Sequence, residues 1–90
     1  MTTATASPAT SLHDVVVTNE QTRAEWRAGR ASIDRGRIVV YSKHPPDAVL
    51  DRPASTYTIL AVDGGDRVRR FPNVALDRQA SEPGKRYVFA

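Results

Sequence analysis

Short runs of β-branched and aromatic residues recur along the chain, separated by glycine, proline and charged residues. Residues 15–17 are three valines, residues 38–41 read IVVY, and residues 57–62 form the longest run. Such runs are typical of β-strands that are buried on at least one face. We therefore predict short strands at the following positions: 14–18, 38–41, 57–62, 67–71, 74–76 and 86–89.

A helix is expected after the first strand, because Thr18 opens a capping box. The Thr18 hydroxyl can accept a hydrogen bond from the Gln21 amide, while the Gln21 side chain reaches back to the Thr18 amide. Residues 19–31 then contain only residues that tolerate a helix, and no proline. On this helix three arginines at helical spacing would line one face: Arg23, Arg27 and Arg30.

Residues 63–66 read Asp-Gly-Gly-Asp and predict a tight turn between two strands. A two-residue glycine loop is typical of β-hairpins, and both glycines are expected to adopt positive φ. This loop length fixes the register, which places Val62 opposite Arg67 and Leu60 opposite Arg69. One face of the hairpin would then carry two arginines over aliphatic side chains, as a contact surface would.

Together these elements predict an α+β domain at 13–90. We expect a small, strongly bent antiparallel sheet, or an SH3-like or OB-like open barrel, of four to six short strands with one N-terminal helix. Residues 1–12 are rich in Thr, Ala and Ser and are expected to form an N-terminal arm, either flexible or bound to a partner. This arm lacks the features of a secretory signal, and no apolar run approaches the roughly 20 residues of a membrane span, so a cytoplasmic protein is expected.

Composition narrows the possible chemistry. The 90 residues include no cysteine, which removes disulfides, thiolate nucleophiles and cysteine-bound metals. The 13 basic and 10 acidic residues give a net charge of +3, a weak signal beside that of dedicated nucleic-acid binders. His13 and His44 have no metal-ligand spacing, and Asp63 with Asp66 offers too few oxygens for Ca²⁺ or Mg²⁺. We assign no metal site, no cofactor and no catalytic residue.

The leading hypothesis is a non-catalytic binding protein that occupies a surface of a macromolecular partner. The partner would be another protein or a second copy of this chain, and the role that of an accessory, assembly or inhibitory subunit. Trp and Arg are enriched among residues that dominate binding energy. The candidate contact residues are therefore Trp26, Arg23, Arg27, Arg30, Arg67 and Arg69. The sequence leaves open whether Trp26 anchors an interface or belongs to the core.

Two other functions stay open. A nucleic-acid-binding barrel would contact phosphates with arginines and stack bases on Tyr41, Tyr57 or Phe71, and its affinity would fall steeply with salt. A small toxin-like ribonuclease would need positioned acids and bases. Its residues would come from this set: Tyr41, His44, Arg67, Arg69, Arg70 and Tyr87.

Overall fold

The computed structural model describes residues 10–43, 47–50 and 55–90, and these form one open antiparallel sheet of eight strands with one helical turn. The spatial order is β6-β5-β1-β3-β4-β8-β7, and β2 pairs with β1 on the same side as β3. The elements are β1 (Thr10–Asn19), β2 (Glu25–Arg27), β3 (Arg30–Asp34), β4 (Arg37–Tyr41), α1 (Asp47–Leu50), β5 (Tyr57–Asp63), β6 (Val68–Val74), β7 (Leu76–Glu82) and β8 (Arg86–Phe89).

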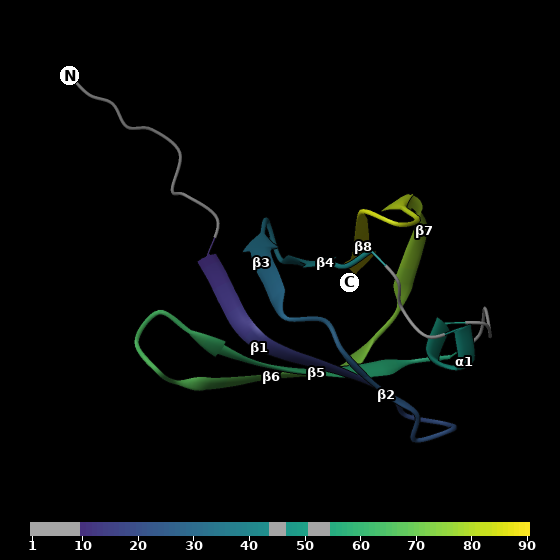
Figure 1. Ribbon diagram of the computed structural model, residues 1–90, viewed down its shortest axis with the longest axis horizontal. Coiled ribbons are helices and arrows are strands. Elements are labelled where there is room, and N and C mark those ends of the chain that lie inside the picture. The colour runs from purple at the N-terminus through teal and green to yellow at the C-terminus, as the bar shows by residue number, and fades with distance from the viewer. Residues whose placement is uncertain (1–9, 44–46, 51–54) are drawn as a thin grey trace.

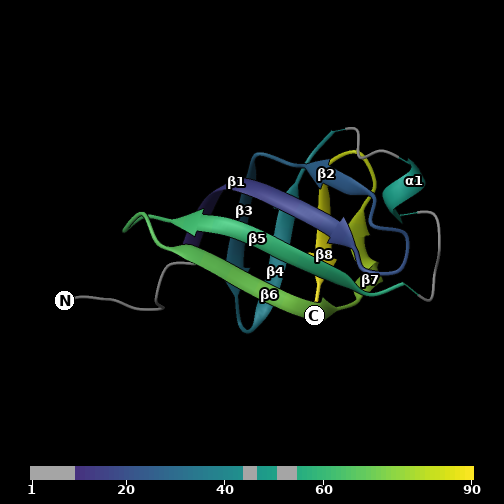
Figure 2. The same ribbon diagram turned by 90° about the horizontal axis from the view of Figure 1, so that it is seen from below.

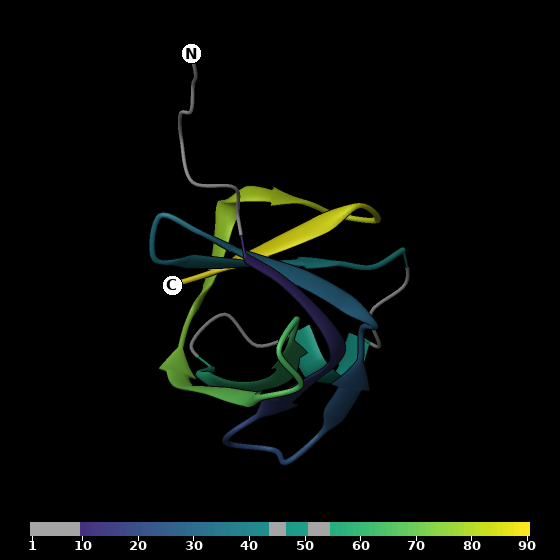
Figure 3. The ribbon, with the colours of Figure 1, turned by 90° about the vertical axis from the view of Figure 1, so that its left-hand side faces the viewer.

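The sheet bends so that its two halves face each other across the core. Strands β6, β5, β1 and β2 form one layer, and they cross the strands β4, β8 and β7 of the other layer (Figures 1 and 2). Viewed from one end, the sheet curls around the core, with β6 and β7 as the two ends of the strand order (Figure 3). These two strands are neighbours in sequence, and Ala75 between them pairs with Ala90 through two backbone hydrogen bonds of 2.9 and 3.0 Å.

Bulges help this sheet to bend. In β1 the pairing with β5 shifts between His13 and Val16, where Asp14 adopts a φ of 51°. A bulge bends its strand and increases the local twist. It also lets both Leu12 and Val15 point inward, which strict alternation would forbid, and they are only 3% and 1% exposed.

Aromatic side chains connect the two layers. The Tyr57 ring on β5 meets the Phe89 ring on β8 edge-on, with centroids 5.4 Å apart. Trp26 on β2 meets Tyr87 on β8 in the same manner. Val49 and Leu50 of α1 are buried with them in the same core.

The predicted helix over 19–31 is wrong, and so are the α+β class and the count of four to six strands. This segment forms a loop, then β2 and the start of β3. The Asn19 side-chain oxygen accepts hydrogen bonds from the two amides of the following turn, and Arg23 adopts a φ of 67°, so the chain reverses. Strand β2 then pairs with β1 and points Trp26 into the core. The segment predicted to be a capped helix is therefore a loop that joins β1 to its partner strand β2.

The hairpin of β5 and β6 is confirmed, but its predicted register is wrong by one residue. Val62 lies opposite Val68, and Leu60 lies opposite Arg70. The loop has an additional residue because Asp66 takes the left-handed conformation, at a φ of 60°, while neither glycine does. A slip of one residue exchanges the faces of a strand. Phe71 and Arg69 therefore share the face of buried Ile59 and Ala61, and Arg70 points to the outer face.

Three of the other predicted strands are confirmed, whereas the separate strand predicted at 74–76 is wrong, because Ala75 lies between the end of β6 and the start of β7. Residues 38–41, 57–62 and 86–89 all lie within strands, and the turn between β7 and β8 has Gly84 at a φ of 85°, as a type II turn requires. Strand β1 begins at Thr10, inside the segment expected to be the arm, and residues 1–9 lie outside the described residues. Within the described chain no helix has the length and apolar character needed to cross a bilayer.

Candidate functional site

The outer face of the first layer carries a row of four side chains across four strands. Val16 of β1 is paired with Arg27 of β2 on one side and with Leu60 of β5 on the other. Leu60 in turn is paired with Arg70 of β6. Because paired residues of neighbouring strands point to the same face, two aliphatic side chains lie between two arginines.

The next row extends the apolar part of this face. Val62 is paired with Val68 across the β5–β6 hairpin. Leu60 is 38% exposed and Val68 is 71% exposed, whereas Ile59 on the opposite face is fully buried. We call the surface made by Val16, Leu60, Val62 and Val68, with Arg27 and Arg70 at its sides, the Leu60 face. An aliphatic surface on a sheet, bordered by charged groups, is typical of an interaction site.

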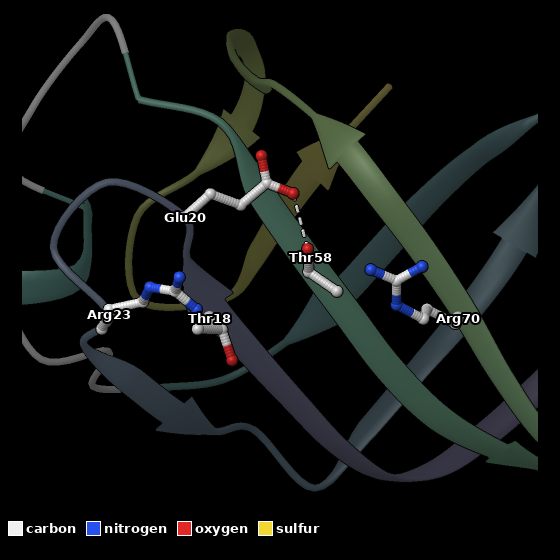
Figure 4. A pocket seen from close by; sticks show the side chains of 5 residues that line it. All are labelled: Thr18, Glu20, Arg23, Thr58 and Arg70. Carbon is white, nitrogen blue, oxygen red and sulfur yellow. Dashed lines mark hydrogen bonds between the residues drawn. The ribbon is translucent and has the colours of Figure 1, made fainter.

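A polar pocket of about 380 Å³ adjoins the Leu60 face. Thr18 and Thr58 are paired on neighbouring strands, and Arg23 and Arg70 lie on opposite sides of them (Figure 4). Glu20 completes the lining from the loop that follows β1. Among the described residues neither arginine of this pocket is within ion-pair distance of a carboxylate.

The Glu20 carboxylate is held by three donors. Its Oε1 accepts a hydrogen bond of 2.6 Å from the Thr56 hydroxyl. Its Oε2 accepts from the Thr58 hydroxyl at 2.5 Å and from the Asn73 amide at 2.9 Å. These bonds, with a smaller contribution from the positive charge of Arg70, lower the pKa of Glu20 from an ordinary value of 4.5 to about 2.

The low pKa of Glu20 and the two arginines determine which chemistry the pocket can support. A carboxylate with so low a pKa is a poor general base, and its oxygens are already used to join the β1–β2 loop to β5 and β6. The guanidinium groups of Arg23 and Arg70 are, in contrast, available. The pocket is therefore suited to binding an anionic group between two arginines rather than to acid–base catalysis.

Strand β6 is the free edge of this layer, but it offers little backbone for a further strand. The Asp63 amide donates a hydrogen bond to the Arg67 carbonyl, so these two residues form a hydrogen-bonded pair. In an antiparallel ladder every second residue of β6 then points its backbone groups away from β5, and these residues are Val68, Arg70 and Pro72. Pro72 has no amide hydrogen, and Asn73 forms a bulge at a φ of 57°. Proline and bulges at an edge oppose strand addition. Contact at this site therefore depends on side chains.

The structure does not gather the six residues predicted to contact a partner. Trp26 is 3% exposed and belongs to the core, which settles the alternative left open above. Arg69 is 3.5 Å from Asp63 and lies over the Phe71 ring at 5.7 Å, away from the Leu60 face. Arg67 lies at the hairpin end. Arg23 and Arg27 border the Leu60 face and its pocket, and Arg30 lies on β3.

Sequence reasoning missed Arg70 and Val68 as members of this site. The predicted two-residue loop would place both on the opposite face, and the left-handed conformation of Asp66 at a φ of 60°, which lengthens the loop, shifts them to the outer face. Glu20 was missed for a different reason. Its donors are Thr56 just before β5, Thr58 of β5 and Asn73 of β6, which are 36 to 53 residues away, and no local pattern indicates them.

The residues proposed for the two alternative functions are also separated. Tyr57 and Tyr87 are buried, and Phe71 is half-buried beneath Arg69, so none of these rings is free to stack on a base. Tyr41 is 44% exposed but lies on β4, in the other layer. His44 lies outside the described residues.

The described residues contain no group of three or more histidine, aspartate or glutamate side chains placed to bind a metal ion. At the hairpin end, the Asp63 carboxylate is occupied by the Arg67 and Gly65 amides, which with Arg69 lower its pKa. No protein-family model, curated protein or solved structure matches the chain.

Proposed function

We propose that this protein is a non-catalytic binding protein whose Leu60 face docks on a protein partner. The partner presents an aliphatic surface to Leu60 and Val68, and an acidic side chain to the pocket between Arg23 and Arg70. The expected role is that of an accessory, assembly or inhibitory subunit. We also propose the cytoplasm as the compartment, which imaging of the tagged chain tests.

One observation supports this proposal: Leu60 and Val68 are exposed beside half-buried Val16 and Val62. Arg27 and Arg70, at the two ends of the row that contains Leu60, make no ion pair among the described residues. Removing exposed aliphatic area of this kind from water stabilises a complex by about 25 cal/mol per Å². Unpaired arginines add directional binding of carboxylates. Together they select a partner that is both apolar and acidic.

A second copy of this chain fits the Leu60 face less well than a different protein. A symmetric dimer sets the same patch of each copy against the other. It would bring Arg27 and Arg70 of one copy near the same arginines of the second, and like charges across an interface oppose association. A different protein is therefore the expected partner.

The test compares capture of host proteins by the immobilised wild-type chain and by three variants. Leu60→Asp and Arg70→Glu change the face, whereas Arg35→Glu makes the same charge reversal in the β3–β4 turn. We expect one protein to be retained by wild type and by Arg35→Glu. Its affinity, measured after purification, should fall at least about 30-fold for Leu60→Asp and about tenfold for Arg70→Glu.

Circular dichroism must show that each variant keeps the fold. Equal capture by all four chains would contradict the proposal. So would a concentration-dependent dimer, seen by analytical ultracentrifugation, that Leu60→Asp abolishes, because the face would then bind a second copy.

A further inference from the structure

A second surface, on the opposite layer, gathers cations around one exposed aromatic ring. Tyr41, at the end of β4, is paired with Arg30 of β3 on one side and with Arg86 of β8 on the other. Tyr41 is 44% exposed, and its hydroxyl lies 3.2 Å from the Ser32 hydroxyl, which orients the side chain toward β3. The two arginines therefore border the ring on the same face of the sheet.

Both lysines of the chain belong to the same place. Lys43 lies two residues after Tyr41, and Lys85 lies in the β7–β8 turn. The Lys85 carbonyl accepts a hydrogen bond of 3.2 Å from the Ser42 amide, which holds the two segments together. Tyr41 and the two lysines line one depression of about 410 Å³, together with Ser42 and Gly84. We call Tyr41, Arg30, Lys43, Lys85 and Arg86 the Tyr41 cluster.

The cluster carries a marked excess of positive charge. Arg86 pairs with Glu82 at 3.1 Å, but the other three cations make no ion pair with any carboxylate that the structure describes. In the whole chain acids nearly balance bases, 10 against 13. Among the described residues, the Tyr41 cluster brings four cations and only the carboxylate of Glu82 close to one exposed aromatic residue.

We propose that the Tyr41 cluster binds single-stranded nucleic acid, with one base stacked on Tyr41 and the flanking phosphates on Lys43, Lys85 and Arg30. A stacked base needs an exposed aromatic face, and phosphates need cations on both sides of it. A duplex hides the faces of its bases, so the site selects an unpaired strand. This function is independent of the Leu60 face and does not require the partner proposed for it.

The test measures fluorescence anisotropy of labelled oligo(dT) and oligo(U) of about 15 nucleotides, a length typical of such sites. Three to four phosphate contacts predict that affinity falls about 20- to 50-fold between roughly 50 and 200 mM salt. Tyr41→Ala should weaken binding about 5- to 100-fold, whereas Tyr41→Phe, which keeps the ring, should bind like wild type. Lys43→Glu combined with Lys85→Glu should abolish binding.

The matched control is Arg35→Glu combined with Arg67→Glu, which changes the net charge equally at sites outside the cluster. This control should bind within about threefold of wild type, since distant exposed charges are screened by salt. Equal loss in both double variants, or binding unaffected by Tyr41→Ala, would overturn the proposal, because net charge alone would then explain it. Equal affinity for polyglutamate would also overturn it. Comparison of oligo(dT) with oligo(U) shows whether DNA or RNA is preferred.

Discussion

The indole of Trp26 meets the Tyr87 ring edge-on, with ring centroids 5.5 Å apart and an angle of 89° between their planes. This contact joins β2 to β8, two strands that are distant in the sequence and lie in opposite layers of the sheet. Edge-to-face pairs add about 0.5–1.5 kcal/mol to the free energy gained by burial. Trp26 therefore stabilises the bent form of the sheet from within.

Replacing Trp26 with Ala should lower the free energy of unfolding by about 3–5 kcal/mol, because it leaves a cavity between the layers. Denaturant titration followed by circular dichroism measures this loss. Trp26→Phe, which keeps an aromatic ring, should cost less. A loss below about 1 kcal/mol for the Ala variant would be too small for a buried indole and would show that the ring is exposed.

The segment around Trp26 also shows why the sequence favoured a helix here. Helix propensity is a local preference of a few tenths of a kcal/mol per residue, and pairing with β1 together with burial of the indole outweighs it. The alternation of exposed and buried residues across Glu25, Trp26 and Arg27 is only three residues long. So short a pattern cannot be distinguished from one turn of a helix.

Asn19 is fully buried and connects the β1–β2 loop to α1. Its side-chain amide donates to the Val49 carbonyl at 3.0 Å, while its oxygen accepts the two amides of the turn. Asn19→Asp keeps the acceptor but places a carboxylate against a carbonyl oxygen, and should cost at least about 2 kcal/mol at neutral pH. This loss should shrink in acid, where the protonated side chain can donate. Unfolding titrations at both pH values measure it, and a loss that does not depend on pH would contradict the contact.

The hydrogen bonds to Glu20 predict an acid-dependent loss of stability. Its folded pKa of about 2 lies below the ordinary value of 4.5, so the unfolded chain binds the proton more tightly. The stabilisation is complete above pH 4.5 and is lost as the pH falls toward 2. Denaturant titrations of wild type and Glu20→Gln across this window should converge toward low pH.

Glu20→Gln should be the less stable protein at neutral pH, since its amide nitrogen cannot accept a hydrogen bond in place of a carboxylate oxygen. Some acid sensitivity should remain in the variant, because the lowered pKa of Asp63 acts in the same direction. If the difference between the two proteins stayed constant across the window, the carboxylate would not be held by its three donors.

Three single substitutions test the register of the β5–β6 hairpin. Because Gly64 is not in the left-handed region and a side chain there would meet open space, Gly64→Ala should change stability by less than about 0.5 kcal/mol. Asp66→Gly should be neutral or slightly stabilising, and Asp66→Val should cost about 1–2 kcal/mol at positive φ. Thermal unfolding measures all three changes. If Gly64→Ala lowered stability by more than about 1 kcal/mol, Gly64 would have to adopt positive φ, as the two-residue turn requires, and the three-residue loop would be contradicted.

The loop of the β5–β6 hairpin limited how much of the candidate site could be derived from the sequence, because its length sets the register of β6. The run of residues 57–62 was sufficient to predict β5 and its exposed Leu60, and the glycines were sufficient to predict the reversal. The conformation of Asp66 was not predictable, because a two-residue and a three-residue loop both suit this sequence. That single residue determines whether Arg69 or Arg70 lies beside Leu60.

The most direct test of the Leu60 face is site-specific photo-crosslinking in the host cell. A photoreactive phenylalanine analogue replaces Val68 in one chain and Arg35 in a second, both of which are exposed. We predict one dominant crosslinked protein from position 68, absent from position 35 and lost when Arg70→Glu is added. Equal crosslinking from both positions, or crosslinking at position 68 only to copies of the same chain, would contradict a heterologous partner at this face.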